Sequence, residues 1–154
     1  MGAGRRRWAA AGAAVLAAGV LLAVAVPRDG DPGPQLRSLR EDPLGRYVPP
    51  GGRLVRTDAN DKESGGMFTK PSPATFRRLF AIPPDAGPAA MQDAVDAARA
   101  SGWTVGAPLG DLGSTGRKRL STGEATMAVT LITDARALPD DVPAPALTIG
   151  LEHN

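Results

Sequence analysis

Hydrophobic and polar residues over the last two thirds of the chain alternate in the manner of half-buried β-strands. Within residues 74–82, 126–133 and 146–152, large apolar residues alternate with smaller or polar ones. Side chains two positions apart share one face of a strand, so this pattern predicts strands with one buried face. Further strands are expected at 53–57 and at 103–108. The strand that includes residues 126–133 is expected to open at residue 117, with a turn or bulge at 121–123.

One segment departs from this alternation and predicts a helix. In residues 88–101, apolar residues recur at three- and four-residue spacing from Met91 to Ala98. Pro88 in the first turn and Gly102 just past the end are typical of helix boundaries. The predicted order is β-β-α-β-β-β. Its hairpin-like connections favour an α+β fold, in which a small antiparallel sheet is covered by one helix.

The N-terminal part of the chain has a different pattern. Residues 9–26 form a run of 18 uncharged residues, preceded by Trp8 and by the basic residues 5–7. As a helix, residues 8–26 would span about 28 Å, close to the thickness of the hydrocarbon core. Basic residues favour the cytoplasmic side. The sequence therefore predicts a cytoplasmic tail over residues 1–7 and a transmembrane helix over residues 8–26, with the C-terminal part outside the cytoplasm.

The same run also has an alternative interpretation as a cleaved signal peptide. Ala23-Val24-Ala25 has the small-x-small pattern of a cleavage site. Cleavage near Ala25 would release a secreted protein. The apolar run is longer than is usual for a cleaved peptide, which favours an uncleaved anchor.

Residues 27–52 contain six Pro and five Gly, which predicts a semi-extended linker. Such a linker would hold an extracytoplasmic domain, residues 53–154, a few nanometres from the bilayer. Residues 34–42 are a possible exception, because they could form two helical turns with Leu36 and Leu39 on one side. So short a helix needs to dock on another surface to be stable.

Charge and rare residues exclude several classes of function. Residues 28–154 hold 15 basic and 16 acidic residues, so the chain after the apolar run lacks the basic balance of a nucleic-acid-binding domain. The chain has no cysteine, which excludes disulfides, thiolate metal sites and cysteine nucleophiles. The one histidine, His153, is expected in a frayed chain end, so we expect no Ser or Thr to have a histidine partner.

Two loop motifs have weak likeness to known binding sites. Residues 110–118 superficially look like a phosphate-binding loop, but five residues rather than four separate Gly110 from Gly116, and a strand is expected to follow. We interpret residues 109–116 as a Gly-rich turn.

A cluster of oxygen-bearing side chains could suggest a calcium site: Asp58, Asn60, Asp61 and Glu63. Their spacing does not fit an EF-hand loop, and a solvated loop is the simpler interpretation.

Charged pairs supply the remaining candidates. Arg77-Arg78 and Arg117-Lys118-Arg119 could contact anionic lipid headgroups or envelope polymers, although basic residues also protect sheet edges from pairing. Asp93 and Asp96 lie three apart on the predicted helix, where paired-carboxylate chemistry is conceivable. Polar helix positions commonly carry such residues. We assign no catalytic, cofactor-binding or metal-binding residue.

The layout resembles a loosely defined group of proteins. A basic start, an Ala/Val/Leu anchor, the segment Asp42-Pro43-Leu44-Gly45-Arg46-Tyr47-Val48-Pro49-Pro50-Gly51 and a helix ending in Ser101-Gly102-Trp103 are similar to uncharacterised small single-pass membrane-anchored proteins of high-GC Gram-positive bacteria. This resemblance implies a cell-envelope location and no particular activity.

Together these features predict a single-pass membrane protein whose small external domain is a non-enzymatic interaction or accessory module of the cell envelope. The expected partners are the lipid bilayer, through residues 8–26, and an envelope protein or anionic polymer; nucleic acid is not expected. The alternative is an exported hydrolase that uses carboxylates on envelope polymers. Two carboxylates with perturbed pKa values in a cleft would favour the hydrolase.

Overall fold

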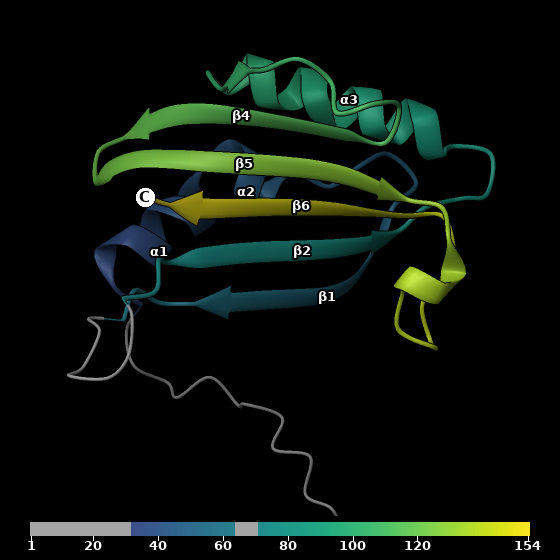
Figure 1. Cartoon of the computed structure of the whole chain (residues 1–154), viewed down its shortest axis with the longest axis horizontal. Coiled ribbons are helices and arrows are strands. Elements are labelled where there is room, and N and C mark those ends of the chain that lie inside the picture. The colour runs from purple at the N-terminus through teal and green to yellow at the C-terminus, as the bar shows by residue number, and fades with distance from the viewer. Residues whose placement is uncertain (1–31, 64–70) are drawn as a thin grey trace, which may run out of the picture. The chain divides into compact units, whose positions relative to one another are not determined.

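The described part of the chain forms one antiparallel sheet with helices against one of its faces (Figure 1). The structure is a computed structural model that describes residues 32–63 and 71–154. Its helices are α1 (Pro34–Glu41), α2 (Pro43–Arg46), α3 (Gly87–Ala100) and the 3-10 helix η1 (Ala135–Ala137). Its strands are β1 (Arg53–Asn60), β2 (Thr75–Ala81), β3 (Thr104–Val105), β4 (Gly113–Leu120), β5 (Gly123–Ile132) and β6 (Ala146–His153).

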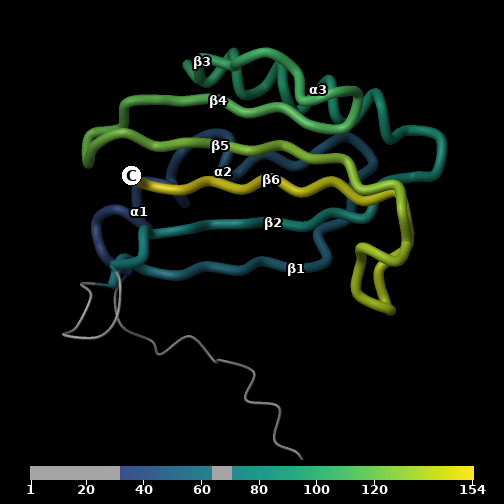
Figure 2. The backbone as a smooth tube through the Cα atoms, viewed as in Figure 1, coloured from purple at the N-terminus to yellow at the C-terminus, as the bar shows by residue number. Residues whose placement is uncertain are grey.

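The last strand lies in the middle of the sheet. The strand order is β1-β2-β6-β5-β4-β3, with every neighbouring pair antiparallel, and Figure 2 shows β6 between β2 and β5. The register places Phe80, Leu147 and Leu131 side by side across β2, β6 and β5, and all three side chains are buried. The hydrophobic core is therefore built around the C-terminal strand.

The predicted α+β fold with a small antiparallel sheet is confirmed. Apolar residues expected to share a strand face do so, and those expected on the inner side of α3 are buried. Several details of the prediction are wrong. The strand expected at 103–108 is limited to Thr104–Val105, and α1 and α2 join α3 on the sheet where one covering helix was expected. Of the turn or bulge expected at 121–123, the turn is observed: residues 121–122 form a hairpin turn, so residues 117–132 belong to two strands, β4 and β5, where one was counted. Residues 113–116, expected in a Gly-rich turn, begin β4.

The N-terminal segment of the described chain is part of the domain. Residues 34–46 were expected within the linker, and this expectation is wrong: α1 and α2 pack on the same face of the sheet as α3. Leu36, Leu39 and Leu44 are at most 4% exposed and belong to the main core. The short helix expected around residues 34–42 forms because these leucines dock on the sheet.

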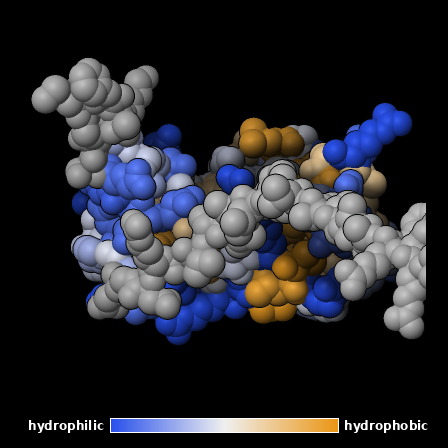
Figure 3. All heavy atoms as spheres, turned by 90° about the horizontal axis from the view of Figure 1, so that it is seen from below, coloured by the Kyte–Doolittle hydropathy of each residue, from blue (hydrophilic) through white to orange (hydrophobic). Residues whose placement is uncertain are grey.

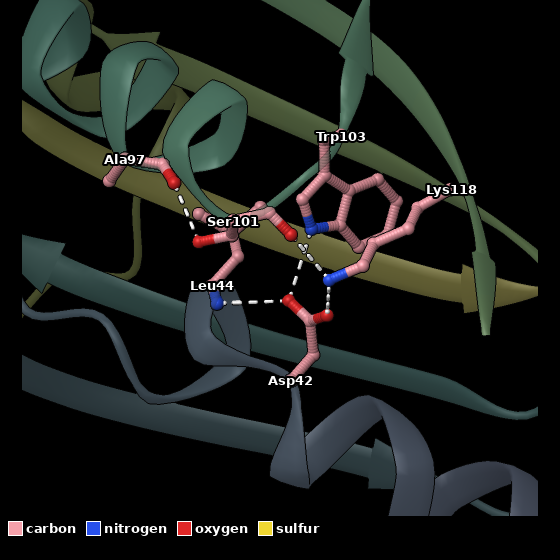
Figure 4. Close-up of polar contacts among 6 residues, drawn as sticks. All are labelled: Asp42, Leu44, Ala97, Ser101, Trp103 and Lys118. Carbon is pink, nitrogen blue, oxygen red and sulfur yellow. Dashed lines mark hydrogen bonds and ion pairs between the residues drawn. The ribbon is translucent and has the colours of Figure 1, made fainter. Parts of the chain in front are cut away.

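A buried polar cluster fixes this segment in place (Figure 4). Asp42, whose side chain is 1% exposed, accepts hydrogen bonds from Trp103 Nε1 at 3.0 Å and from the Leu44 backbone N–H at 2.9 Å. Its other oxygen lies 2.5 Å from Lys118 Nζ, which also donates to the Ser101 carbonyl. We call these residues, Asp42, Leu44, Ser101, Trp103 and Lys118, the Asp42 cluster. They join α2, the end of α3 and β4.

Arg78 supplies a second attachment. Its guanidinium donates to the carbonyl oxygens of Gly45, at 3.0 Å, and Tyr47, at 2.8 Å, and lies over the Phe80 ring. Positive charge is favourable at the carbonyl end of a helix, here α2. Burial lowers the pKa of Arg78 from its ordinary value. A cation on the inner face of β2 therefore holds the chain where α2 ends.

None of the described helices combines the length and the apolar character that crossing a membrane requires. The expected anchor at residues 8–26 lies outside the residues that the structure describes.

Candidate functional site

Within the part of the chain that the structure describes, the sheet face opposite the helices, which we call the open face, is covered at one end only. There the segment between β5 and β6, which includes η1, folds over the sheet (Figure 1). Leu138 and Val142 of this segment pack against Leu79 and Ala146 in a small second core. The rest of the open face carries polar and small side chains from β2, β6, β5 and β4.

Beyond this small core the open face is hollowed. The sheet hollow has a volume of about 610 Å³ and extends across the sheet from β2 to β3. Its polar lining consists of Thr75, Arg77, Thr104, Thr115, Arg117, Thr126 and Glu152. Gly150 and Ala128 are paired neighbours on β6 and β5 and lie between these polar residues. Because they carry no side chain or only a methyl group, they leave space above the sheet.

Two arginines from separate parts of the sequence line this hollow. Arg77 comes from β2 and Arg117 from β4, each from one of the basic runs noted in the sequence. Arg77 lies over the floor, because its Nε is 3.8 Å from where a Cβ of Gly150 would be. The next residues, Arg78 and Lys118, point to the opposite face and are held by carbonyls and by Asp42.

The charges of the hollow are not paired with one another. Among the described residues, no ion pair or side-chain hydrogen bond involves Arg77, Arg117 or Glu152. By contrast, Arg56 on β1 lies 2.7 Å from Asp58 in an exposed ion pair. The two guanidinium groups are therefore available to a ligand, together with the hydroxyls of Thr104, Thr115 and Thr126. The Thr75 hydroxyl accepts a hydrogen bond from Asn60 at 3.4 Å. Chemically, the hollow can bind anions and hydroxyl groups.

The β1 edge of the sheet is a less suitable docking surface. Leu54 is 43% exposed there, but Arg53 and Arg56 flank it, and the register shifts between Leu54 and Arg56. Charged residues and irregular pairing discourage the addition of another strand. Figure 3, which views the molecule from this edge, shows hydrophobic residues in separate patches among hydrophilic ones.

The acidic residues of the calcium interpretation are dispersed. Asp58 pairs with Arg56, and Asp61 accepts a hydrogen bond from the backbone N–H of Gly33 at the start of α1. In the ranges that the structure describes, no group of three or more His, Cys, Asp or Glu residues could hold a metal ion. Asp61 thus helps to cap α1.

The carboxylate pair of α3 is exposed on the outer side of the helix. Asp96 accepts hydrogen bonds from Gln92 at 3.0 Å and from Arg99 at 2.8 Å. The hydrogen bond from Gln92, and after it the contact with Arg99, lower the pKa of Asp96. A general acid needs the opposite shift. The surroundings of Asp96 therefore shift its pKa away from the range of a general acid.

His153 was expected in a frayed end, without a hydroxyl partner, and both expectations are wrong. It is 3% exposed at the end of β6, and its Nε2 lies 3.0 Å from Thr122 Oγ1. Thr122 Oγ1 in turn lies 2.8 Å from Ser38 Oγ. This chain of contacts ties β6, the β4–β5 turn and α1 together. At its two ends, the other ring nitrogen of His153 contacts the Asn154 carbonyl, and Ser38 donates to the Gln35 carbonyl.

The stretch that looked like a phosphate-binding loop is partly a β-strand. Residues 113–118, the end of the stretch that looked like a phosphate-binding loop, lie in β4, so a strand occupies the place where such a loop requires a helix.

Comparison with protein families, with curated proteins and with solved structures finds no match. The case for function therefore rests on the geometry of the open face.

Tyr47 offers a direct test of how α2 is packed. Its hydroxyl is buried without a hydrogen-bond partner among the described residues, and burial, followed by the negative charge of Asp93, raises the pKa of Tyr47. Since it is the only tyrosine, absorbance at 295 nm should give a midpoint above about 10, the ordinary value.

The same shift predicts how stability depends on pH. Below about pH 10 the phenol is protonated in both states, and its contribution to stability is fully present. As the pH rises through the folded-state pKa, that contribution is lost. The urea-unfolded chain, as control, should titrate at the ordinary value; an identical midpoint in the folded chain would contradict the packing.

Proposed function

We propose that this chain is a single-pass membrane protein of the cell envelope. In this proposal residues 8–26 form the anchor, the N-terminus is cytoplasmic, and the α+β domain is a non-enzymatic interaction module outside the cytoplasm. The apolar run and its preceding arginines support the anchor and its orientation. Cleavage near Ala25 is the alternative, and the intact mass of the native protein distinguishes the two.

The observation that carries the interaction role is the open face. Helices cover one side of the sheet, whereas the other side presents the sheet hollow with unpaired arginines and threonine hydroxyls. Long polar side chains on a rigid sheet are well placed to bind a partner, because the sheet fixes their spacing. We therefore take the sheet hollow as the docking surface.

The test uses the absence of cysteine from the chain. Single cysteines replace Ala128, exposed on the open face, or Ala100, exposed at the end of α3. Both variants are labelled in intact native cells with a membrane-impermeant, thiol-reactive photocrosslinker, and the captured species are identified by mass spectrometry. We expect Ala128→Cys to capture a defined envelope component that Ala100→Cys does not.

Two results would contradict the proposal in different ways. If neither cysteine is labelled while an external control protein reacts, the domain is not outside the cytoplasm. If both are labelled but capture the same species, or none, the open face is not the docking surface.

A further inference from the structure

We propose that the sheet hollow binds a phosphodiester-linked polyol chain, held through its phosphates by Arg77 and Arg117. This inference rests on the proposed role of the open face as a docking surface and names the chemistry of the partner. It follows from four observations: the two cations, their separation, the composition of the floor, and the pairing of the sheet backbone.

The cations select a negatively charged ligand. Arg77 and Arg117 line the same hollow, and Glu152 is the one carboxylate among the described residues that line it. Over the four strands β2, β6, β5 and β4, the open face also carries Arg119 opposite Glu124, so positive charge remains in excess there. Guanidinium groups bind phosphates through paired hydrogen bonds of fixed geometry, which makes an unpaired arginine a good phosphate ligand.

The separation of the arginines favours an extended ligand. Arg77 and Arg117 lie on β2 and β4, with β6 and β5 between them. Three steps between neighbouring strands place their backbones about 14 Å apart across the sheet. A chain with several negative groups can occupy both positions at once. A single small anion would bring the two long side chains together over the floor and would leave most of the hollow empty.

The floor favours a ligand rich in hydroxyl groups over one that stacks. Thr75, Thr104, Thr115 and Thr126 line the hollow, and threonine hydroxyls both donate and accept hydrogen bonds. Phe76 contributes to the lining, but its ring belongs to the core on the other side of the sheet. Single-stranded nucleic acids are bound largely by stacking on aromatic side chains, which the described residues of this floor do not offer. A flexible polyol has no such requirement.

The sheet itself argues against a peptide. β2, β6 and β5 are paired on both sides, and β4 is paired along its length with β5 and, at Gly116 and Arg117, with β3. The backbone groups beneath the hollow are therefore used within the sheet. Peptides that dock on sheets commonly add a strand at an exposed edge and bind through main-chain hydrogen bonds. Here only side chains are available, and they match phosphates and hydroxyls. An acidic peptide is therefore the competing occupant in the test.

Glu152 gives the proposal a second, opposite prediction. It lies in the register row of Arg117, separated from it by Thr126 on β5, and shares the hollow with both arginines. A phosphate chain across the floor passes near this carboxylate, which repels it. Neutralising Glu152 should therefore strengthen binding, whereas neutralising either arginine should weaken it. A merely structural role for these exposed residues would not produce effects of opposite sign.

The experiment measures binding of poly(glycerol phosphate) of defined length to the full chain in neutral-lipid vesicles, by isothermal titration calorimetry. Arg77→Ala and Arg117→Ala should each weaken the affinity about tenfold, the scale of a hydrogen bond to a charged group. Glu152→Gln should strengthen it roughly threefold, as expected for an exposed charge. Arg99→Ala, a matched loss of positive charge on the outer side of α3, should change nothing. Added salt should weaken binding to the unaltered chain.

The comparison ligand is a poly-glutamate peptide of equal charge. The proposal is overturned if the peptide binds as tightly as the polymer, if the two arginine variants bind like the unaltered chain, or if Arg99→Ala weakens binding equally. In each of these cases, site-dependent crosslinking at residue 128 still decides the proposed function on its own. If the cysteine at residue 128 captures a partner but the polymer does not bind, the interaction role of the open face is supported and the proposed ligand is rejected.

Discussion

Replacing Asp42 with alanine is expected to lower the free energy of unfolding by about 3–5 kcal/mol, the cost of removing one partner of a buried ion pair. Asp42 is 4% exposed, and its loss leaves Lys118 Nζ without its carboxylate. It also leaves the Trp103 indole N–H and the Leu44 backbone N–H unpaired. All three donors are buried or partly buried, so water replaces the carboxylate poorly.

The measurement is urea unfolding of the full chain in detergent. Replacing Trp8 with phenylalanine leaves Trp103 as the only tryptophan, so fluorescence reports directly on the Asp42 cluster. Asp58→Ala is the matched control, because its ion pair with Arg56 is largely exposed and should contribute less than about 1 kcal/mol. Equal effects of the two substitutions would show that the Asp42 cluster does not form.

A second control separates charge from packing. Adding Lys118→Met to Asp42→Ala removes the cation that has lost its partner. The double variant should recover part of the lost stability, because apolar replacement of a buried ion pair is often tolerated. A double variant less stable than Asp42→Ala alone would mean that Lys118 stabilises the fold by contacts other than the ion pair.

Replacing Leu39 with alanine should lower the free energy of unfolding by about 2–5 kcal/mol, the range for truncating a buried leucine. Leu39 is fully buried and packs in the main core together with Leu36 and Leu44. The substitution removes buried apolar surface and leaves a cavity between α1 and the sheet. Val48→Ala, at a side chain that is 51% exposed, is the control and should have a small effect.

This prediction tests whether residues 34–46 belong to the domain. The same urea unfolding, followed by Trp103 fluorescence, measures both variants. A flexible linker would tolerate Leu39→Ala as readily as Val48→Ala. Near-zero effects of both would therefore contradict the docking of α1, irrespective of what the domain binds.

Periodicity predicted the elements whose residues alternate strongly. The strand expected at 146–152 is β6, and the helix expected at 88–101 is α3, each within one residue of its observed bounds. The start of β4 was missed, because Gly113 and Gly116 gave it the composition of a turn. Gly116 is small for a reason that only the fold reveals: a Cβ there would lie 2.9 Å from the Thr104 carbonyl on β3.

Composition misled the interpretation of residues 34–46 for a related reason. Pro34 and Pro43 are the first residues of α1 and α2, a position where proline fits a helix well. In a stretch rich in proline and glycine, the same residues indicated a linker. Their helical role depends on the leucines that dock on the sheet, and docking partners far along the chain are not visible in a local pattern.

Only half of the candidate site could be predicted. The basic runs at Arg77 and Arg117 were visible in the sequence, but which residue of each run faces the hollow depends on strand register. That both arginines line one hollow depends on β6 lying between β2 and β5, a long-range arrangement that leaves no local signal. The Thr122–His153 contact was missed for the same reason, since it joins a hairpin turn to the last strand.

Because α1 is docked on the sheet, fewer residues than expected connect the domain to the proposed anchor. With the proposed anchor ending at residue 26, only residues 27–33 precede α1, and a fully extended chain of that length spans about 25 Å. Most of residues 27–52, expected to act as a spacer, instead belong to the folded body or lie against it. If residues 8–26 are the anchor, as we propose, the start of α1 can lie no more than about 25 Å along the chain from the membrane surface, and a polymer bound in the sheet hollow would then be held in the layer of the envelope next to the membrane.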